Sequence, residues 1–279
     1  MGSRVTPDTL LAMKQRGEPI AMLTCYDYPT ALQQEAADVD IIFIGDSVGI
    51  NILGYEGPQQ VTMEDMIHHT RAVRRGVKKA LLVSDMPYGA YATPDQAARN
   101  ALRLVEAGAE AVKLEGGLEV VGCVASILAR GIPVIGHVGH TPQSREGGRA
   151  VFGDRADEAL AVFESARALT EAGIIAIVLE CIPERVAEII TKALSVPTIG
   201  IGSGRNCDGQ VLVTPDMLGW NRTPYRFVKY YADLAAVTRK AFSDYVTDIK
   251  TRKFPSDEHR FRVKSEELQK FRELMNRFK

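Results

Sequence analysis

The sequence predicts a (β/α)8 TIM barrel with a C-terminal helical extension. Eight short apolar runs, rich in β-branched residues, alternate with longer stretches of helical spacing, and such runs are typical of parallel strands buried on both faces. Polar residues end most of these runs. In a closed barrel these residues would meet at one mouth, whereas in a doubly wound open sheet, which is the alternative, they would spread along an edge.

The strands can be placed in order from the apolar runs. We expect them near residues 20–24, 41–45, 80–84, 111–114, 132–136, 174–179, 197–201 and 211–213. Between them, residues 94–107 have the clearest helical pattern, because Pro94 suits a first turn and Gly108 follows as a stop. The pattern recurs at 156–173 and at 183–194.

The end of the chain differs from the rest. A helix is expected from about Pro224 to Tyr245, and residues 256–279 are highly charged, with Leu268 and Phe271 among apolar residues at helical spacing. We therefore divide the chain into a barrel domain, 1–255, and a charged helical tail, 256–279. We interpret the tail as a packing or oligomer-contact helix.

Composition narrows the class of protein. An apolar fraction of 46% and a charged fraction of 25% are ordinary for a globular protein, and the net charge of −1 argues against a broad nucleic-acid surface. The four cysteines form no Cys-x-x-Cys pair, so they are expected to be free thiols in a reducing compartment. No apolar run approaches the roughly 18 residues of a membrane span. A soluble cytoplasmic protein is the expectation.

Three predicted strands end in acids, namely Asp46, Asp85 and Glu115. A carboxylate at the end of a buried strand is costly to desolvate unless it meets a cation or hydrogen-bond donors. Carboxylate oxygens suit a hard divalent metal, so Asp46 and Asp85 are candidate direct ligands and Glu115 a third, direct or through water. The alternative is that these acids cap the helices that follow.

Three further side chains are candidates for chemistry. Lys113 lies two residues before Glu115, so both point into the barrel, where the lysine either pairs with Glu115 or binds a substrate carboxylate or enolate. His137 ends a strand and is either a satisfied core residue or a catalytic group. Glu180 ends another strand, where burial would raise its pKa and suit it to acid–base work, unless a distant arginine pairs with it.

A glycine-rich stretch, residues 200–209, follows the seventh strand at a place where barrels often bind phosphate. It has neither a Walker nor a Rossmann pattern of glycines. We therefore expect a tight structural turn here.

Several stretches, in order, resemble the ketopantoate hydroxymethyltransferase (3-methyl-2-oxobutanoate hydroxymethyltransferase) family from about residue 8 to about residue 259. They include Thr-Cys-Tyr-Asp-Tyr (24–28), Gly-Asp-Ser-Val-Gly (45–49), Val-Lys-Leu-Glu-Gly-Gly (112–117), Gly-His-Val-Gly (136–139), Thr-Pro-Gln-Ser (141–144), Leu-Glu-Cys-Ile-Pro (179–183) and Gly-Ile-Gly-Ser-Gly (200–204).

The resemblance implies a Mg²⁺-dependent (β/α)8 barrel, usually a homo-oligomeric decamer in bacteria. Such an enzyme transfers a one-carbon unit from 5,10-methylenetetrahydrofolate to 3-methyl-2-oxobutanoate and gives 2-dehydropantoate for pantothenate synthesis. The resemblance also implies which residues bind the metal, bind the substrate and transfer protons. Mg²⁺ is placed on Asp46, Asp85 and Glu115, the 2-oxo acid against Asp46, Ser47, Asp85 and Lys113, and proton transfer on Glu180, with His137 as second candidate.

The chain departs from the family pattern in two loops at the predicted mouth, 57–60 and 145–155, and His140 stands where leucine is usual. The second loop adds Arg145, Arg149 and Arg155. These changes leave a different 2-oxo acid open as substrate. A C–C lyase or mutase of the phosphoenolpyruvate mutase and isocitrate lyase type, which would need no folate, also stays open, as does a barrel without catalytic activity.

Overall fold

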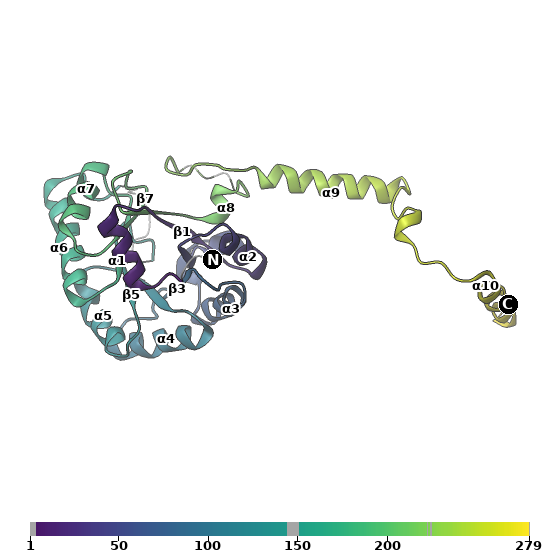
Figure 1. Cartoon of the computed structure of the whole chain (residues 1–279), viewed down its shortest axis with the longest axis horizontal. Helices are drawn as coiled ribbons and strands as arrows, with labels where there is room; N and C mark the ends of the chain where they lie inside the picture. The colour runs from purple at the N-terminus through teal and green to yellow at the C-terminus, as the bar shows by residue number, and fades with distance from the viewer. Residues whose placement is uncertain (1–3, 144–150, 222, 224, 279) are drawn as a thin grey trace. The chain divides into compact units, whose positions relative to one another are not determined.

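Eight parallel strands form a closed barrel in which each strand pairs with the next along the chain and the last pairs with the first (Figure 1). The structure is a computed structural model that describes residues 4–143, 151–221, 223 and 225–278. The strands are β1 (Ile20–Thr24), β2 (Ile41–Ile44), β3 (Leu81–Asp85), β4 (Ala111–Glu115), β5 (Val134–Gly139), β6 (Ala176–Glu180), β7 (Thr198–Ile201) and β8 (Gly209–Leu212).

The first helix precedes the strands and buries Leu10 and Met13 against the apolar cluster inside the barrel, the short last helix of the barrel lines the cavity described below, and the helices between them follow strands and surround the barrel (Figure 1). They are α1 (Pro7–Arg16), α2 (Tyr28–Ala36), α3 (Met63–Arg74), α4 (Pro94–Ala107), α5 (Val121–Leu128), α6 (Ala156–Ala172), α7 (Glu184–Ala193) and α8 (Thr214–Met217). The prediction for α4 is confirmed at both ends, since Pro94 lies in the first turn and Gly108, with a φ of 117°, ends the helix. The predicted helices at 156–173 and 183–194 are confirmed within one residue at each end as α6 and α7.

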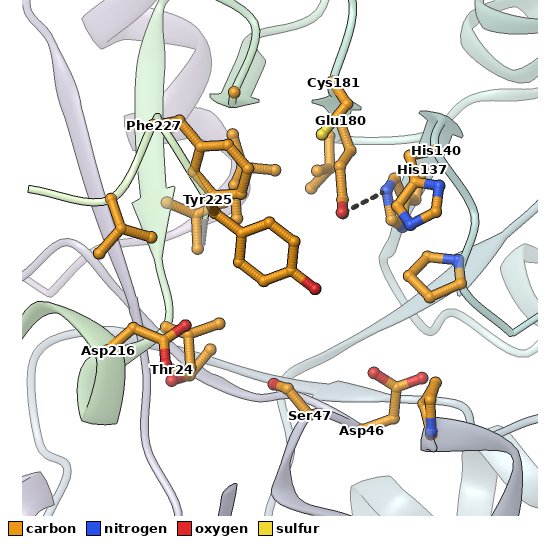
Figure 2. A pocket seen from close by; sticks show the side chains of 18 of the residues that line it. Thr24, Asp46, Ser47, His137, His140, Glu180, Cys181, Asp216, Tyr225 and Phe227 are labelled. Atoms are coloured by element: carbon orange, nitrogen blue, oxygen red, sulfur yellow. Dashed lines mark ion pairs between the residues drawn. The ribbon is translucent and has the colours of Figure 1, made fainter. Parts of the chain in front are cut away.

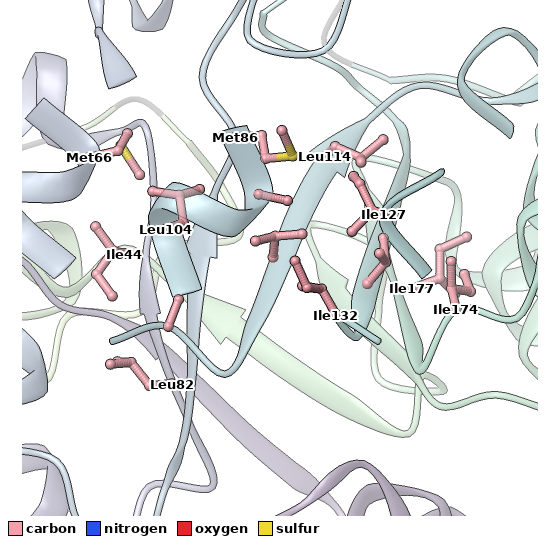
Figure 3. Close-up of a cluster of buried hydrophobic side chains, with 14 of the residues drawn as sticks. Ile44, Met66, Leu82, Met86, Leu104, Leu114, Ile127, Ile132, Ile174 and Ile177 are labelled. Carbon is pink, nitrogen blue, oxygen red and sulfur yellow. The ribbon is translucent and has the colours of Figure 1, made fainter. Parts of the chain in front are cut away.

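Alternation along the strands separates two apolar clusters. Phe43, Val83 and Ile135 belong to the cluster inside the barrel, whereas Ile44 and Leu82, one position away, belong to the cluster between barrel and helices (Figure 3). Side chains of successive strand residues point to opposite faces, so each strand is buried on both sides. Burial on both faces explains the continuous apolar runs in the sequence.

The register of the barrel brings polar strand ends together. Asp85 pairs in register with Lys113 across β3 and β4, and Glu115 pairs with His137 across β4 and β5. All four lie on the inward-facing side, in phase with the inner apolar cluster. Parallel strands thus deliver these side chains to a single end of the barrel.

By its internal contacts the chain divides into two compact units, Met1–Tyr231 and Ala232–Lys279. The second unit contains α9 (Leu234–Lys250) and α10 (Ser265–Met275), neither of which buries a residue. The division into domains 1–255 and 256–279 stays a prediction. The predicted helix from about Pro224 to Tyr245 was wrong at its start, because Asp233 caps the first turn of α9 by accepting a hydrogen bond from the amide of Ala236.

None of the helices in the described ranges combines the length and the apolar character that crossing a membrane requires.

Candidate functional site

A cavity of about 710 Å³ opens at the carboxyl ends of the strands (Figure 2). Every side chain predicted from the sequence to take part in binding or chemistry lines it, and the set is Asp46, Ser47, Asp85, Lys113, Glu115, His137 and Glu180. They come from the ends of β3, β4, β5 and β6 and from the loop that follows β2. The structure therefore brings the whole predicted set to one place.

Lys113 is buried and forms an ion pair with Asp85, with 2.9 Å between Nζ and Oδ1. Its ammonium also lies 3.4 Å from Nδ1 of His137 and 5.4 Å from the ring centroid of Phe43. From the sequence, Glu115 was a possible structural partner of Lys113. The ion pair is made instead with Asp85, because these two residues lie opposite each other in the ladder between β3 and β4.

His137 lies between two carboxylates. Its Nδ1 is 3.3 Å from Oε1 of Glu115, and its Nε2 is 3.1 Å from Oε2 of Glu180 (Figure 2). His137 and Glu115 are buried, whereas the Glu180 side chain keeps 17% of its surface exposed toward the cavity. Among the described residues, the partner of Glu180 is thus a histidine and not a distant arginine. The arrangement leaves Glu180 in contact both with His137 and with any bound ligand.

Asp46 is held by a residue that sequence reasoning did not single out. Nε2 of Gln143 donates a hydrogen bond to Oδ2 of Asp46 over 2.8 Å, and its backbone amide donates to Oε2 of Glu115 over 3.0 Å. The backbone amide of Asp46 in turn donates to Oδ2 of Asp85 over 3.4 Å. Gln143 therefore links two carboxylates that lie far apart in the sequence.

The electrostatics of the site follow from burial and crowding. Burial, together with Asp46 and Glu115, raises the pKa of Asp85 to about 8 against the opposing effect of Lys113. Burial and Glu115 also raise the pKa of Asp46. Burial opposes charge on Lys113 and His137 as well, but the surrounding carboxylates prevail, so the pKa of Lys113 is raised and that of His137 reaches about 9. Despite burial, His137 and Lys113 lower the pKa of Glu115.

These shifts show that carboxylates outnumber the cations that could neutralise them. Oδ1 of Asp85 is buried and accepts no hydrogen bond among the described residues, although the Lys113 ammonium is near. An added divalent cation would relieve this imbalance, and Mg²⁺ needs only one or two carboxylates, with waters and substrate oxygens completing its coordination. Within the described ranges no three His, Cys, Asp or Glu side chains are grouped so that they could hold a metal ion. The residues present therefore fit a metal that one or two carboxylates hold and that water and substrate oxygens otherwise coordinate.

The remaining candidates have definite places. The hydroxyl of Ser47 lies 2.8 Å from that of Tyr26 at the cavity wall. Of the three added arginines, Arg145 and Arg149 lie outside the described residues. Arg155 directs its guanidinium to Asp157 at the start of α6 and is not among the residues that line the cavity.

The glycine-rich stretch forms a tight structural turn, as predicted. Ser203 donates a hydrogen bond to the carbonyl of Leu179 and accepts one from the amide of Ile182. Gly204 has a φ of 79°, and a Cβ there would lie 2.4 Å from Cγ of Glu184. The turn is thus filled by neighbouring side chains.

Sequence reasoning missed several lining or supporting residues, namely Tyr26, Tyr91, Gln143, Asp216, Tyr225 and Phe227. Gln143 and Tyr26 occur inside the quoted stretches 141–144 and 24–28, but an amide or a phenol has no spacing pattern of its own. Asp216 follows Thr214 and Pro215, which look like an ordinary helix start. Only the closure of the barrel reveals that these residues share a cavity.

The arrangement can bind an anion and move a proton. Lys113 supplies a buried positive charge, and Glu180 offers a carboxylate paired with a histidine, a combination suited to general acid–base chemistry. The carboxylates around Lys113 fit a metal that would polarise a bound carbonyl.

Known proteins resemble this chain in sequence and in structure. The sequence model of the family described as ketopantoate hydroxymethyltransferase matches residues 4–257. A 3-methyl-2-oxobutanoate hydroxymethyltransferase of Bacillus cereus (strain ATCC 10987 / NRS 248) is 48% identical over 268 residues, 94% of this chain and 96% of the relative. One from Carboxydothermus hydrogenoformans is 48% identical over 272 residues, 96% of this chain and 99% of the relative.

Solved structures share the fold at low identity. Phosphonopyruvate hydrolase in complex with oxalate and Mg²⁺ matches with a TM-score of 0.62 at 16% identity, covering 98% of this chain and 97% of the other. A 2,3-dimethylmalate lyase of the phosphoenolpyruvate mutase and isocitrate lyase superfamily matches with a TM-score of 0.58 at 14% identity, covering 96% and 98%.

Proposed function

The chain belongs to the ketopantoate hydroxymethyltransferase family and is a hydroxymethyltransferase, and from this premise we propose its substrates and mechanism. It moves a one-carbon unit from 5,10-methylenetetrahydrofolate to 3-methyl-2-oxobutanoate and gives 2-dehydropantoate for pantothenate biosynthesis. The observation that carries the proposal is the buried contact of His137 with Glu180 beside Lys113 and its carboxylates. This group supplies both an anion site and a base within one cavity.

Asp46 and Asp85 would hold Mg²⁺, with Glu115 as a third ligand, direct or through water. When bound, the metal would act as a Lewis acid on the keto group, an effect worth several kcal/mol, and so acidify the neighbouring C–H. Gln143 orients Asp46 through the hydrogen bond from its side-chain amide. Support for the metal comes from the surplus of buried carboxylates and the raised pKa of Asp85.

Lys113 and Ser47 would hold the oxo acid. The Lys113 ammonium is fixed by Asp85, so it can attract the substrate carboxylate and then stabilise the negative charge that develops on the enolate. The Ser47 hydroxyl, held by the Tyr26 hydroxyl, offers a hydrogen bond to the same ligand. Both residues lie on the wall of the cavity beside the metal candidates.

Glu180 would accept the proton from C3 of the oxo acid, a role typically worth about 10²–10⁴ in rate. Water adds its oxygen to the methylene carbon of the folate as the bonds from that carbon to N5 and to N10 break in turn and both nitrogens take up protons. The enolate carbon then forms a bond to the one-carbon unit released at the formaldehyde level, and the oxygen of that unit takes a proton to become the hydroxyl of the product. His137 contacts Glu180 and Glu115 at the same time, so it orients the base and, as the second candidate for proton transfer, can donate a proton.

Two alternatives are distinguished by substrate. A different 2-oxo acid stays open, and it would be ruled out if 3-methyl-2-oxobutanoate had the highest kcat/KM among the oxo acids tested. A lyase would cleave its substrate without folate. The likeness to a lyase shows a shared fold at 14% identity, whereas the hydroxymethyltransferases are 48% identical over nearly the whole chain.

We further propose a cytoplasmic homo-oligomer, a decamer by family resemblance. Support comes from large apolar side chains that are exposed on α9 and α10, among them Phe242, Tyr245 and Phe271. Burial of such side chains against other copies of the chain would remove apolar surface from water.

The activity is tested by incubating the protein with Mg²⁺, 5,10-methylenetetrahydrofolate and 3-methyl-2-oxobutanoate and measuring 2-dehydropantoate. We expect product only when metal and folate are both present. Product from a single substrate without folate, by cleavage, would establish the lyase instead. A panel of 2-oxo acids under the same conditions then ranks substrates by kcat/KM.

A further inference from the structure

Asp216 is a buried acid in α8 that lines the cavity apart from the candidate metal ligands (Figure 2). The residue is only 7% exposed, yet among the described residues no side chain or amide forms a hydrogen bond or ion pair with its carboxylate. Burial alone raises its pKa to about 6, with no cation opposing the shift. A buried carboxylate without a partner is costly unless a ligand supplies hydrogen-bond donors.

The backbone that carries Asp216 is held firmly in place. The amide of Thr214 donates to the hydroxyl of Thr24 over 2.9 Å, and Nε2 of Gln34 donates to the Thr214 hydroxyl over 3.0 Å. These contacts tie α8 to the end of β1 and to α2. Asp216 is therefore held at the cavity wall by a short helix whose backbone is fixed by these hydrogen bonds.

Asp216 lies across the cavity from Glu180 and His137, so the two sides of the cavity suit different ligands (Figure 2). The oxo acid is anionic, so it belongs beside Lys113 and the candidate metal ligands and would be repelled by Asp216. A cavity of about 710 Å³ is in the range that holds drug-sized ligands and is much larger than this small branched acid requires. The space near Asp216 therefore remains for the second substrate.

An aromatic wall lies in the same cavity. The rings of Tyr225 and Phe227 are stacked, with 5.4 Å between centroids and 15° between planes, and both residues line the cavity with Asp216 (Figure 2). Flat rings of this kind pack favourably against a flat heterocycle. A ligand that combines a planar ring with adjacent N–H donors would satisfy both the aromatic wall and the carboxylate.

We propose that Asp216 binds the pterin ring of the folate donor, with its two carboxylate oxygens accepting hydrogen bonds from the ring N3–H and the 2-amino group. The proposal rests on the proposed function, because that function supplies the folate. Two parallel N–H···O bonds to a carboxylate fix the orientation of a planar group, as they do for a guanidinium. Asp216 would thereby set the direction in which the methylene group faces the oxo acid.

The test compares Asp216→Asn with the wild type in two assays. The amide presents a donor where the ring also presents donors, so the KM for 5,10-methylenetetrahydrofolate should rise about 10- to 100-fold. The KM for the oxo acid and the folate-free, Mg²⁺-dependent exchange of its C3 proton should stay within about twofold of wild type, because Asp216 contacts neither. An unchanged KM for folate would overturn the proposal.

Calorimetry with tetrahydrofolate and with its analogue lacking the 2-amino group adds a second test. The wild type should bind the analogue about tenfold or more weakly, whereas Asp216→Asn should hardly distinguish the two ligands. Equal discrimination by both proteins would contradict the contact. The exposed Asp95 at the start of α4, changed to Asn, serves as control and should behave as wild type in every assay.

Failure of the proposed function and failure of the pterin contact give different results. If the wild type neither exchanges the C3 proton of any 2-oxo acid nor forms product, the proposed function is wrong. If it does both and Asp216→Asn keeps wild-type folate binding, only the pterin contact is wrong.

Discussion

The Tyr91 hydroxyl donates a hydrogen bond to Oε1 of Gln143 over 2.6 Å. Because this bond occupies the amide oxygen, Nε2 faces the other way and donates to Asp46 over 2.8 Å and to the carbonyl of Met86 over 3.1 Å. A tyrosine outside the set of candidate ligands thus decides which end of the Gln143 amide meets a candidate metal ligand.

Tyr91→Phe should weaken Mg²⁺ binding without removing any ligand. Loss of the hydroxyl leaves the amide oxygen of Gln143 unpaired and allows the amide to turn over, so Asp46 loses its fixed donor. We expect the Mg²⁺ concentration for half-maximal activity to rise about 3- to 10-fold and stability to fall by about 1 kcal/mol. Tyr88→Phe is the matched control, because Tyr88 is 56% exposed and lies three residues away. An unchanged Mg²⁺ requirement in Tyr91→Phe would contradict this role.

Mg²⁺ should stabilise the folded protein. At a free concentration 100 times its Kd, a ligand that binds only the native state adds about 2.7 kcal/mol, which corresponds to a rise in Tm of about 5–10 °C for a chain of this size. Asp85→Asn should lose most of this rise, since one proposed ligand is gone, whereas Asp95→Asn should keep it. Differential scanning calorimetry with Mg²⁺ and with a chelator measures the effect, and an Asp85→Asn shift equal to wild type would remove Asp85 from the metal site.

Without ligands, Asp216→Asn should be more stable than the wild type, and the difference should increase as pH rises. The folded pKa of about 6 exceeds the usual 3.8, so between these values the native state binds more protons than the unfolded state and wild-type stability falls with rising pH. The full shift corresponds to about 3 kcal/mol, but solvent in the cavity screens the charge and we expect about 1 kcal/mol.

The measured quantity is the Tm of Asp216→Asn minus that of wild type, followed from pH 5 to pH 8 without ligands. It should be positive and grow until about pH 7. Other charged or titratable groups near Asp216 are Tyr26, whose pKa is raised mainly by burial and slightly by Asp216, and Arg226, which lines the same cavity. A lower Tm for the variant at every pH would indicate a structural partner for Asp216 and count against ligand binding.

Gly204→Ala should destabilise the protein more than Gly17→Ala. Both glycines have a positive φ, 79° and 65°, but a Cβ at Gly204 would lie 2.5 Å from Cβ of Glu184, whereas nothing lies within 4 Å at Gly17. We expect roughly 1 kcal/mol for the backbone strain alone at Gly17 and at least about 2 kcal/mol at Gly204. Chemical denaturation compares the two, and equal losses would show that the turn after β7 is not tightly packed.

Much of the fold was predictable because it depends on local patterns. Apolar runs marked all eight strands within a few residues, and Pro94 with Gly108 defined α4, because first-turn prolines and left-handed glycines act through their own backbone. The start of α9 was predicted about ten residues too early, since residues 225–228 instead line the cavity, and helical spacing alone does not reveal such a tertiary contact.

Only those residues of the candidate site that lie at or near strand ends could be predicted from the sequence. Asp85, Lys113, Glu115, His137 and Glu180 end strands or lie near their ends, so closure of the barrel brings them together. Their pairing was not predictable, because the ion pair of Lys113 with Asp85 depends on the register between β3 and β4.

Residues outside the strands that contribute to the site could not be recognised from the sequence. Gln143 reaches Asp46 across 97 positions of sequence, and Asp216 reaches the cavity from a helix of a single turn. Their roles depend on how the loops at the barrel mouth fold over one another, and no local pattern encodes that arrangement.

Glu180, beside His137, is the residue that we propose removes a proton from an oxo acid bound in this cavity. NMR of deuterium exchange at C3 of 3-methyl-2-oxobutanoate in D₂O, with protein and Mg²⁺ and without folate, observes this step alone. We expect Mg²⁺-dependent exchange by the wild type, and a rate about 10²–10⁴ lower for Glu180→Gln with the same thermal shift on Mg²⁺ addition. Exchange at the wild-type rate by Glu180→Gln would show that another group is the base.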